Sequence, residues 1–291
     1  MFERELKIAI DVAREAGEKV LDYYALEVIA EEKLGLDDFA EPVTVADRAS
    51  SRIIVDRLRA AFPKDFVLSE EEQDDPHART QAKRIWITDP IDGTAGFLKK
   101  DGDFAIQIGL AIDGDPVVGV VFLPAHNTLY FGSRGAASFV VRDDAPPVRL
   151  RVSDNIDFGL MNLAVSRNHR SPKISRIVSE FGLRSEVQRG SVGLKVGLVA
   201  EAVCDIYVHL SPRTKFWDTC GPQIILEEAG GRLTDLFGER IRYEIADVQN
   251  YGGIVAANGS AHGRIIEKLA PILNEFGRTR MVGRVSQIRE R

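Results

Sequence analysis

The first half of the chain begins with two helical patterns separated by a polar segment. Apolar residues recur at three- and four-residue steps at Leu6, Ile10, Ala13, Gly17, Val20 and Leu21. This spacing predicts an amphipathic helix. A second helix is predicted to begin after Thr44, a suitable N-cap, with Asp47 at the capping-box position and a stop at Pro63. The polar residues 27–42 between the helices are predicted to form a loop.

The pattern then changes to that of strands. Strands are predicted at Phe66–Ser69, Arg84–Asp89, Phe104–Asp113, Pro116–Leu123 and Thr128–Phe131. The Asp113-Gly114 dipeptide is typical of a tight hairpin turn between two of them.

From about residue 160, helices and strands alternate. The predicted strands are Met161–Val165, Asp205–Leu210 and Gly253–Ala256. The predicted helices are Pro172–Phe181, Val192–Ala202, Asp218–Ala229 and Ser260–Leu273. Two helices, an antiparallel block and an alternating part together predict an α/β fold of alternating helix and sheet layers (α+β layered). We expect an N-terminal half over residues 1–150, a C-terminal half over 151–273 and a basic, arginine-rich tail over 274–291.

Composition narrows the class of partner. The 291 residues are 44% hydrophobic and 28% charged, which is an ordinary globular balance. The net charge of -6 does not provide the positive field that non-specific binding of a nucleic acid polymer requires. An acidic protein that acts on an anionic substrate needs another source of positive charge, and a metal ion is the obvious one.

Cysteine usage and hydropathy indicate the compartment. The chain has two cysteines, Cys204 and Cys220, and no CxxC pair, so a disulfide framework and a thiolate zinc site are both unexpected. The first 20 residues mix charged and apolar positions and do not read as a signal peptide. No apolar stretch reaches the roughly 18 residues of a membrane span. We therefore expect a cytoplasmic protein without a membrane partner.

The segment Asp89-Pro-Ile-Asp-Gly-Thr94 is the strongest candidate for chemistry. A hydrophobic strand delivers Asp89, Pro90 is expected to end the strand, and the turn returns Asp92 beside Asp89. Two carboxylates that face one point favour a cation between them, and oxygen ligands without His or Cys favour Mg²⁺. A strand-end turn with solvated aspartates is the alternative. A phosphatase of the haloacid dehalogenase type is excluded, because its two aspartates are one residue apart.

Two further segments add carboxylates. Glu70 and Glu71 follow a short apolar strand, and Asp218 opens a helix after Trp217. Taken alone, the glutamates read as solvated surface charge and Asp218 as a residue that complements the helix dipole. Their order along the chain makes the set more specific.

That order resembles the inositol monophosphatase superfamily. The motifs that carry the resemblance are Val43–Asp47, Glu70-Glu71, Asp89–Thr94, Trp217-Asp218 and Glu228–Gly231, and it covers residues 5–273. The resemblance implies the layered fold of the inositol monophosphatase and fructose-1,6-bisphosphatase type. It also implies a magnesium-dependent, lithium-sensitive phosphatase of small molecules.

Within that superfamily the chain is most similar to the 3'(2'),5'-bisphosphate nucleotidases. The similar segments are Asp89–Leu98, Ser166–His169, Leu194–Glu201, Phe216–Gln223 and Gly230–Asp235. Three positions depart from the nucleotidase pattern: Ala95 replaces a lysine, Val192 a serine and His209 an arginine. The last two bear on the nucleotide assignment more than on the phosphatase assignment.

The resemblance implies a role for each matching residue. Two or three Mg²⁺ ions would be held by Glu70, Asp89, Asp92, Asp218 and the backbone carbonyl of Ile91, with Glu71 as a supporting carboxylate. Thr94 and Asp47 would form the catalytic dyad that activates the attacking water. The substrate would be bound by Gly93, Thr94, Ser166, His169, Lys195, Arg213 and Asp218.

The implied reaction is hydrolysis of the 3'-phosphate of adenosine 3',5'-bisphosphate to AMP and phosphate by a metal-activated water. An inositol monophosphatase, or a phosphatase of histidinol or sugar phosphates with the same metal mechanism, is the closest alternative. A non-catalytic sensor of metal or nucleotide is a different class, and loss of a ligand or of the dyad would favour it. The expected partner is a small phosphate substrate, and the expected assembly is a monomer or homodimer.

Overall fold

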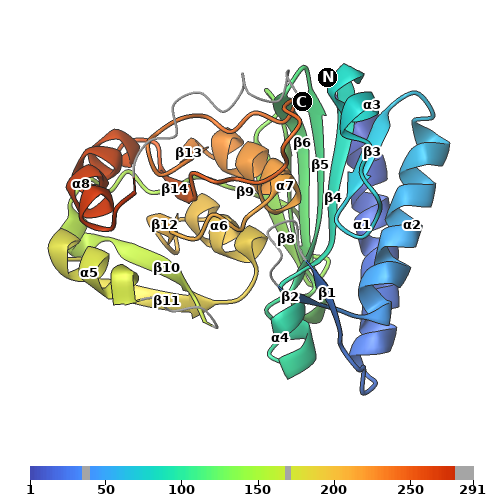
Figure 1. The fold of residues 1–291 in the computed structure, drawn as a ribbon, viewed down its shortest axis with the longest axis horizontal. Coiled ribbons are helices and arrows are strands. Elements are labelled where there is room, and N and C mark those ends of the chain that lie inside the picture. Colours follow the sequence, from blue (N-terminus) through green and yellow to red (C-terminus); the bar gives the residue numbers. More distant parts are fainter. Residues whose placement is uncertain (35–39, 168–171, 279–291) are drawn as a thin grey trace.

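The computed structural model describes residues 1–34, 40–167 and 172–278, and helix and sheet layers alternate across it (Figure 1). A pair of long helices covers one face of a seven-stranded sheet, and a second pair separates that sheet from a five-stranded one. A third pair covers the outer face of the five-stranded sheet. This is the layered α/β arrangement that the sequence predicts.

The seven-stranded sheet has the order β3-β4-β5-β6-β7-β8-β9. Strands β3 and β4 are parallel, and every later pair is antiparallel. The strands are β3 (Phe66–Ser69), β4 (Arg84–Asp92), β5 (Ala105–Ile112), β6 (Asp115–Leu123), β7 (Thr128–Ser133), β8 (Ser138–Arg142) and β9 (Val148–Arg149). Asp113 and Gly114 have φ of 50° and 79°, so the predicted tight turn joins β5 to β6.

The first two helices are α1 (Glu3–Tyr24) and α2 (Val45–Ala61), and both pack on the seven-stranded sheet. The predicted apolar stripe of α1 is buried at Ala13, Gly17 and Val20. The predicted capping box of α2 is also present, with Thr44 as the N-cap and Asp47 at the third helical position. Both helices therefore follow their sequence signals.

The segment between these helices corrects the prediction of a loop at residues 27–42. Strands β1 (Glu31–Leu34) and β2 (Ala40–Val43) pair there as an antiparallel ladder. The sequence Glu-Glu-Lys-Leu of β1 lacks the β-branched and aromatic residues that mark strands, so composition gives little sign of it.

The five-stranded sheet has the order β11-β10-β12-β14-β13. Its strands are β10 (Asn162–Ser166), β11 (Ser185–Arg189), β12 (Ile206–His209), β13 (Gly231–Thr234) and β14 (Ile254–Asn258). Its three strands β11, β10 and β12 are parallel, whereas β14 runs antiparallel to β12 and β13. Helices α5 (Pro172–Phe181) and α8 (His262–Glu275) bury their apolar faces against its outer side.

The middle layer consists of α6 (Val192–Ala200) and α7 (Phe216–Glu228). The backbone of helix α7 packs directly against the backbone of the seven-stranded sheet. Gly109 of β5 and Gly119 of β6 are cross-strand partners, and both lie directly under Gly221 of α7. A β-carbon on Gly119 would lie 2.2 Å from the carbonyl oxygen of Gly221. Only glycines permit this approach, which fixes the position of α7 and of the residue Asp218 in its first turn.

Several short elements were not predicted: β8, β9, β11, β13, α3 (Pro76–Gln81) and α4 (Thr94–Lys99). Helix α8 ends at Glu275, two residues beyond its predicted end and inside the predicted tail. Residues 279–291 of that tail lie outside the described residues. The division of the chain at residue 150 stays a prediction.

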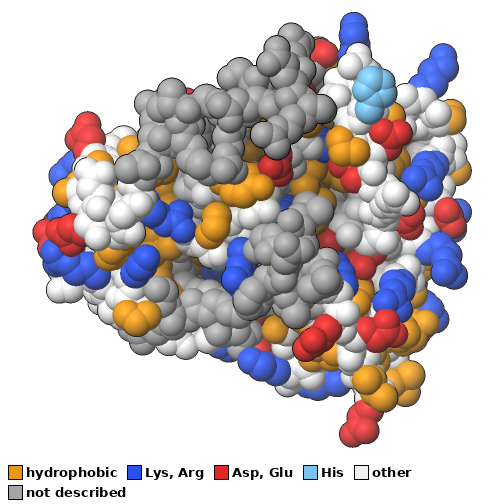
Figure 2. Space-filling model, in the orientation of Figure 1, with side chains coloured by type: hydrophobic (Ala, Val, Ile, Leu, Met, Phe, Trp, Pro, Cys, Tyr) orange, Lys and Arg blue, Asp and Glu red, His pale blue; other side chains and the backbone are white. Residues whose placement is uncertain are grey.

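Three further observations concern membrane-spanning helices, surface charge and the cysteines. Among the described residues, no helix is both long enough and apolar enough to cross a membrane. Acidic and basic side chains are interspersed on the face drawn in Figure 2. Cys204 and Cys220 are both buried free thiols.

Replacing Gly119 with alanine tests the close approach of α7. The added methyl group has no space, so we expect Gly119→Ala to cost about 2 kcal/mol and to lower Tm by roughly 5 °C. Gly263→Ala is the matched control, because Gly263 lies in α8 and a β-carbon added there would have no neighbour within 4 Å. That change should raise Tm slightly through helix propensity. Equal Tm values for the two variants in a thermal melt would contradict the packing argument.

Candidate active site

A cavity of about 250 Å³ lies where the two sheets and the middle helices meet. The carboxyl ends of the parallel strands β3 and β4 face it, together with the first turns of α6 and α7. Ten of the predicted site residues line it: Glu70, Asp89, Ile91, Asp92, Gly93, Thr94, Ser166, Lys195, Arg213 and Asp218. Segments that are far apart in the sequence therefore contribute to one site.

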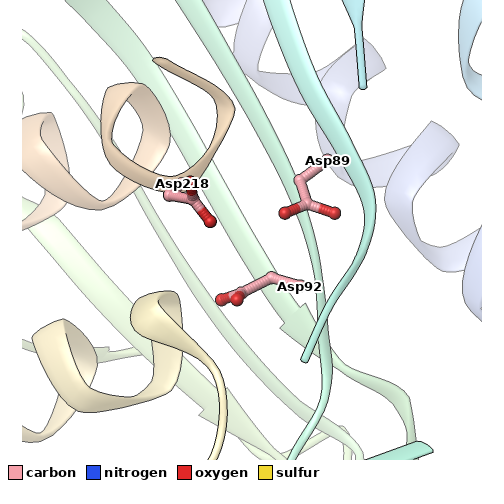
Figure 3. A group of neighbouring side chains, drawn as sticks. All are labelled: Asp89, Asp92 and Asp218. Atoms are coloured by element: carbon pink, nitrogen blue, oxygen red, sulfur yellow. The ribbon is translucent and has the colours of Figure 1, made fainter. Parts of the chain in front are cut away.

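A β-bulge brings Asp89 and Asp92 to the same side of β4. Residues three positions apart on a regular strand face opposite sides of the sheet. Here Asp89 pairs with Gln107 and Asp92 with Ala105, so β4 has one residue more than β5 between these pairs. This corrects the expectation that Pro90 ends the strand, because β4 continues to Asp92. The extra residue lets both carboxylates face the space below the first turn of α7 (Figure 3).

Helix α7 supplies the third carboxylate. The oxygen atoms that Asp89, Asp92 and Asp218 offer lie within 4.8 Å of one another, and Figure 3 shows the three side chains converging from β4 and α7. One oxygen of Asp218 accepts a hydrogen bond from the backbone N–H of Lys215 at 2.6 Å. Asp89 likewise accepts from the backbone N–H of Ile91 at 3.0 Å. These bonds orient the carboxylates without neutralising them.

The electrostatics of this group favour a bound cation. Burial raises the pKa of Asp89 well above its usual range, and the charges of Glu70, Asp92 and Asp218 raise it further. Burial also raises the pKa of Asp218 well above its usual range, with Asp92 as the next cause. Three clustered carboxylates with no His or Cys in the group are a donor set for a hard divalent cation. The residues therefore fit a Mg²⁺ site.

Asp92 is held more firmly than its neighbours. Its Oδ2 accepts hydrogen bonds from Gln107 Nε2 at 2.5 Å, Ser191 Oγ at 2.5 Å and the Gly193 N–H at 2.9 Å. Burial raises the pKa of Asp92, whereas the Ser191 bond and the Lys195 charge act in the opposite direction. Donors from β5 and from the start of α6 thus fix a carboxylate of β4.

Asp47 and Thr94 are in contact, as the resemblance implies. Thr94 Oγ1 lies 3.2 Å from Asp47 Oδ1 and 3.2 Å from the carbonyl oxygen of Ile91. The other oxygen of Asp47, Oδ2, accepts from the Thr44 N–H at 2.8 Å and from Thr44 Oγ1 at 2.6 Å. One oxygen therefore caps α2 while the other meets Thr94. Burial raises the pKa of Asp47.

Two lysines lie among these acids. Lys33 of β1 forms ion pairs with Glu70 at 2.9 Å and with Glu71. Burial alone would lower the pKa of Lys33, but the charges of the two glutamates raise it. Lys195 is 3% exposed and donates to the carbonyl oxygens of Gly190 at 3.0 Å and Ser191 at 2.6 Å. Burial lowers the pKa of Lys195 to about 8, against the opposing charges of nearby aspartates.

Gly93 and the first turn of α4 line the cavity beside Thr94. Gly93 has φ of 95°, and a β-carbon there would lie 2.8 Å from the carbonyl oxygen of Asp103. Glycine is required at this position for both reasons. Helix α4 begins at Thr94 with Gly93 as its N-cap, so the helix start that amide donors would need is present.

The structure describes all but one of the remaining predicted residues. Ser166 and Arg213 line the cavity, and Asp47 reaches it through Thr94. His169 lies outside the described residues. The next residue along from Ser166, Arg167, pairs with Asp101 at 3.2 Å and Asp103 at 2.8 Å, and this joins the end of β10 to the segment after α4.

The site also contains residues that sequence reasoning missed, among them Lys33, Gln107, Ser191 and Lys215. Two of them carried a usable signal. Gln107 is the single polar side chain in the apolar strand Ala105–Ile112, and Ser191 stands directly before a predicted helix, where a cap is common. Lys33 carried none, because it lies in a charged segment with no pattern.

Comparison with known proteins gives a consistent result. The model of the inositol monophosphatase family matches residues 2–274. The chain is 31% identical over 247 residues to the 3'(2'),5'-bisphosphate nucleotidase CysQ of Salmonella typhimurium, which covers 82% of this chain and 93% of that protein. It is 28% identical over 268 residues to the inositol-1-monophosphatase of Bacillus subtilis, with coverage of 90% and 95%. The solved structure of CysQ from Bacteroides thetaiotaomicron superposes with a TM-score of 0.74 at 28% identity, with coverage of 89% and 98%.

Removing one carboxylate tests the repulsion between Asp89, Asp92 and Asp218 in EDTA-treated protein. A pKa raised by folding means that ionisation destabilises the folded state once the pH exceeds about 3.9, the value of an unfolded aspartate. We therefore expect Asp218→Asn to raise the Tm of EDTA-treated protein at pH 8, by roughly 2–4 °C for each kcal/mol relieved. The gain should shrink as the pH falls toward 4, and Mg²⁺ should stabilise the variant less than the native protein.

Asp103→Asn is the matched control for that measurement. Asp103 is also buried, but it pairs with Arg167 and accepts the Gly190 N–H at 2.8 Å. Its substitution should lower Tm at pH 8 in EDTA, because a satisfied charge is lost. If both variants lost stability by the same amount, the aspartates of the cluster would not be repelling one another.

Proposed function

The chain belongs to the inositol monophosphatase family and is a phosphatase, and on that premise we propose that it is a Mg²⁺-dependent phosphomonoesterase. Its proposed substrate is adenosine 3',5'-bisphosphate, from which it removes the 3'-phosphate to give AMP and phosphate. The observation that carries the proposal is the convergence of Asp89, Asp92 and Asp218 beside the Thr94–Asp47 pair. Carboxylates without that pair would suit a purely structural ion.

Glu70, Asp89, Asp92, Asp218 and the carbonyl oxygen of Ile91 are the proposed ligands of two or three Mg²⁺ ions. Ions held there would supply positive charge that neutralises and polarises the phosphate group and lowers the pKa of a water molecule. Glu71 is the proposed supporting carboxylate, because Lys33 forms ion pairs with both Glu70 and Glu71.

The chain's own part in the reaction is to move a proton and hold the phosphate. Thr94 Oγ1 donates to Asp47 Oδ1, so a lone pair of the hydroxyl can accept a proton from the attacking water while Thr94 passes its own proton to Asp47. The raised pKa of the buried Asp47 makes it a better base near neutral pH. The water oxygen forms the new bond to phosphorus as the bond to the 3'-oxygen breaks, and the departing oxygen takes a proton from water to become the 3'-hydroxyl of AMP. The amides of Gly93 and Thr94 are the proposed donors to the phosphate oxygens.

The nucleotide assignment is supported by two relatives. The proteins named CysQ, from Salmonella typhimurium and Bacteroides thetaiotaomicron, cover most of this chain, and the former is described as a 3'(2'),5'-bisphosphate nucleotidase. Ser166, Lys195, Arg213 and Asp218 are the proposed contacts to the rest of the substrate, and all line the cavity. His169 remains part of that prediction.

A second candidate keeps the metal mechanism and changes the substrate. The inositol-1-monophosphatase of Bacillus subtilis matches 90% of this chain, which favours inositol phosphate as the alternative. Histidinol and sugar phosphates belong to the same alternative. A non-catalytic sensor is disfavoured, because no proposed ligand and neither dyad residue is missing from the sequence. Action in the cytoplasm, and a monomer or homodimer as the assembly, also stay proposals.

A panel of substrates tests the assignment. Phosphate release with Mg²⁺ is compared for adenosine 3',5'-bisphosphate, inositol 1-phosphate, histidinol phosphate and fructose 1,6-bisphosphate at matched low concentrations. We expect kcat/KM to favour the bisphosphonucleotide by about a hundredfold, which corresponds to about 2.7 kcal/mol. A preference for another compound would replace the substrate and keep the mechanism. Activity of the native protein that persisted in EDTA would overturn the metal dependence.

Thr94→Ala tests the proton transfer. Without the hydroxyl, the water loses its route to Asp47, so we expect kcat to fall about a hundredfold or more with a smaller change in KM. The control is Thr80→Ala, in the short helix α3, where the hydroxyl bonds only backbone carbonyl groups of its own helix. That variant should keep the native kcat. An unchanged kcat in Thr94→Ala would show that another group accepts the proton.

A further inference from the structure

A second cavity, of about 260 Å³, lies beside the first at the carboxyl ends of β10 and β12. The start of α5 and the residue Arg278, just after α8, close its other sides. Its wall is largely apolar, and the side chains that supply it are Val165, Ile174, Val208 and Leu210.

The two cavities share three of their lining residues. Ser166, Tyr207 and His209 belong to both. Tyr207 is 1% exposed, and its hydroxyl lies 3.3 Å from His209 Nδ1, so these two side chains form a fixed partition. The second cavity therefore adjoins the first, with Tyr207 and His209 between them.

The charge of the second cavity is positive. Lys173 and Arg278 line it, and no Asp or Glu is among its described lining residues. The ammonium group of Lys173 lies 5.1 Å from the ring centre of Phe276, which places it on the α8 side. The cavity thus combines an apolar wall with two cations, whereas the first cavity is dominated by carboxylates.

Arg278 is the more informative of the two cations. Burial lowers the pKa of its guanidinium group, and no described residue forms a side-chain ion pair or hydrogen bond with it. Arg278 is only partly buried, so an anion in the cavity that it lines can reach its guanidinium group. Arg278 also lies beyond residues 2–274, which the family model matches, so it is a feature of this chain rather than of the shared motifs.

We propose that the second cavity binds the non-reacting end of the substrate, and that Arg278 and Lys173 there bind its second anionic group. The apolar wall then contacts another part of the same molecule, which for a nucleotide is the planar base. The inference rests on the proposed function, because it assumes that the 3'-phosphate lies at the aspartates. For adenosine 3',5'-bisphosphate, the group bound by Arg278 and Lys173 is the 5'-phosphate.

Two substrates that differ only in that group test the proposal. Adenosine 3',5'-bisphosphate and adenosine 3'-monophosphate have the same base, sugar and leaving oxygen. In the native protein kcat/KM should favour the bisphosphate. In Arg278→Met, and separately in Lys173→Met, this preference should fall by about tenfold or more, chiefly through KM for the bisphosphate. The control is Lys64→Met, an exposed lysine at the opposite end of β3, which should leave the preference unchanged.

A preference that stays native in both Arg278→Met and Lys173→Met would overturn the proposal while leaving the phosphatase assignment intact. Failure of the proposed function would look different, since the native protein would then release phosphate from neither compound. In that case calorimetric titration with AMP and with adenosine decides the matter. A weaker affinity for AMP in Arg278→Met, with adenosine unaffected, would support the anion site, and equal AMP affinities would exclude it.

Discussion

The site is organised by the cost of placing carboxylates next to one another away from water. Asp89, Asp92 and Asp218 are crowded within a few ångströms, and burial alone opposes their ionisation. Such a group does not assemble spontaneously from flexible segments, because each member is repelled by the others. The surrounding structure must hold it, and most of the features around the cavity can be understood as means of doing so. A divalent cation bound among the three carboxylates would relieve this repulsion.

The holding elements come from different layers of the fold. The bulge in β4 sets the direction of two aspartates, and the glycine contact under Gly221 sets the position of the helix that brings the third. Donors on β5 and at the start of α6 then fix Asp92. Because the sheet, the helix and the loop are each positioned by their own packing, no single segment determines the geometry. The cavity is a product of the whole layered arrangement.

The sequence was a good guide to local structure and to residue type. The capping box at Thr44 and Asp47, the turn at Asp113 and Gly114, and the layered fold all follow from short-range signals and motif order. It was a poor guide where an effect depends on a neighbour. Pro90 was expected to end β4, but the ladder with β5 continues beyond it. The charged strand β1 and the polar edge strand β11 form because partners pair with them, which composition does not reveal.

The two oxygens of Asp47 link a helix end to the proposed proton transfer. One oxygen closes the first turn of α2, and the other meets Thr94. Thr44 and Asp47 are 1% and 3% exposed, so this first turn is protected from the fraying that occurs at exposed helix ends. When the first turn of α2 opens, Asp47 is released from Thr44 and is no longer aligned for Thr94. On the proposed mechanism, loss of this one turn would therefore stop turnover even if the rest of the fold stayed intact.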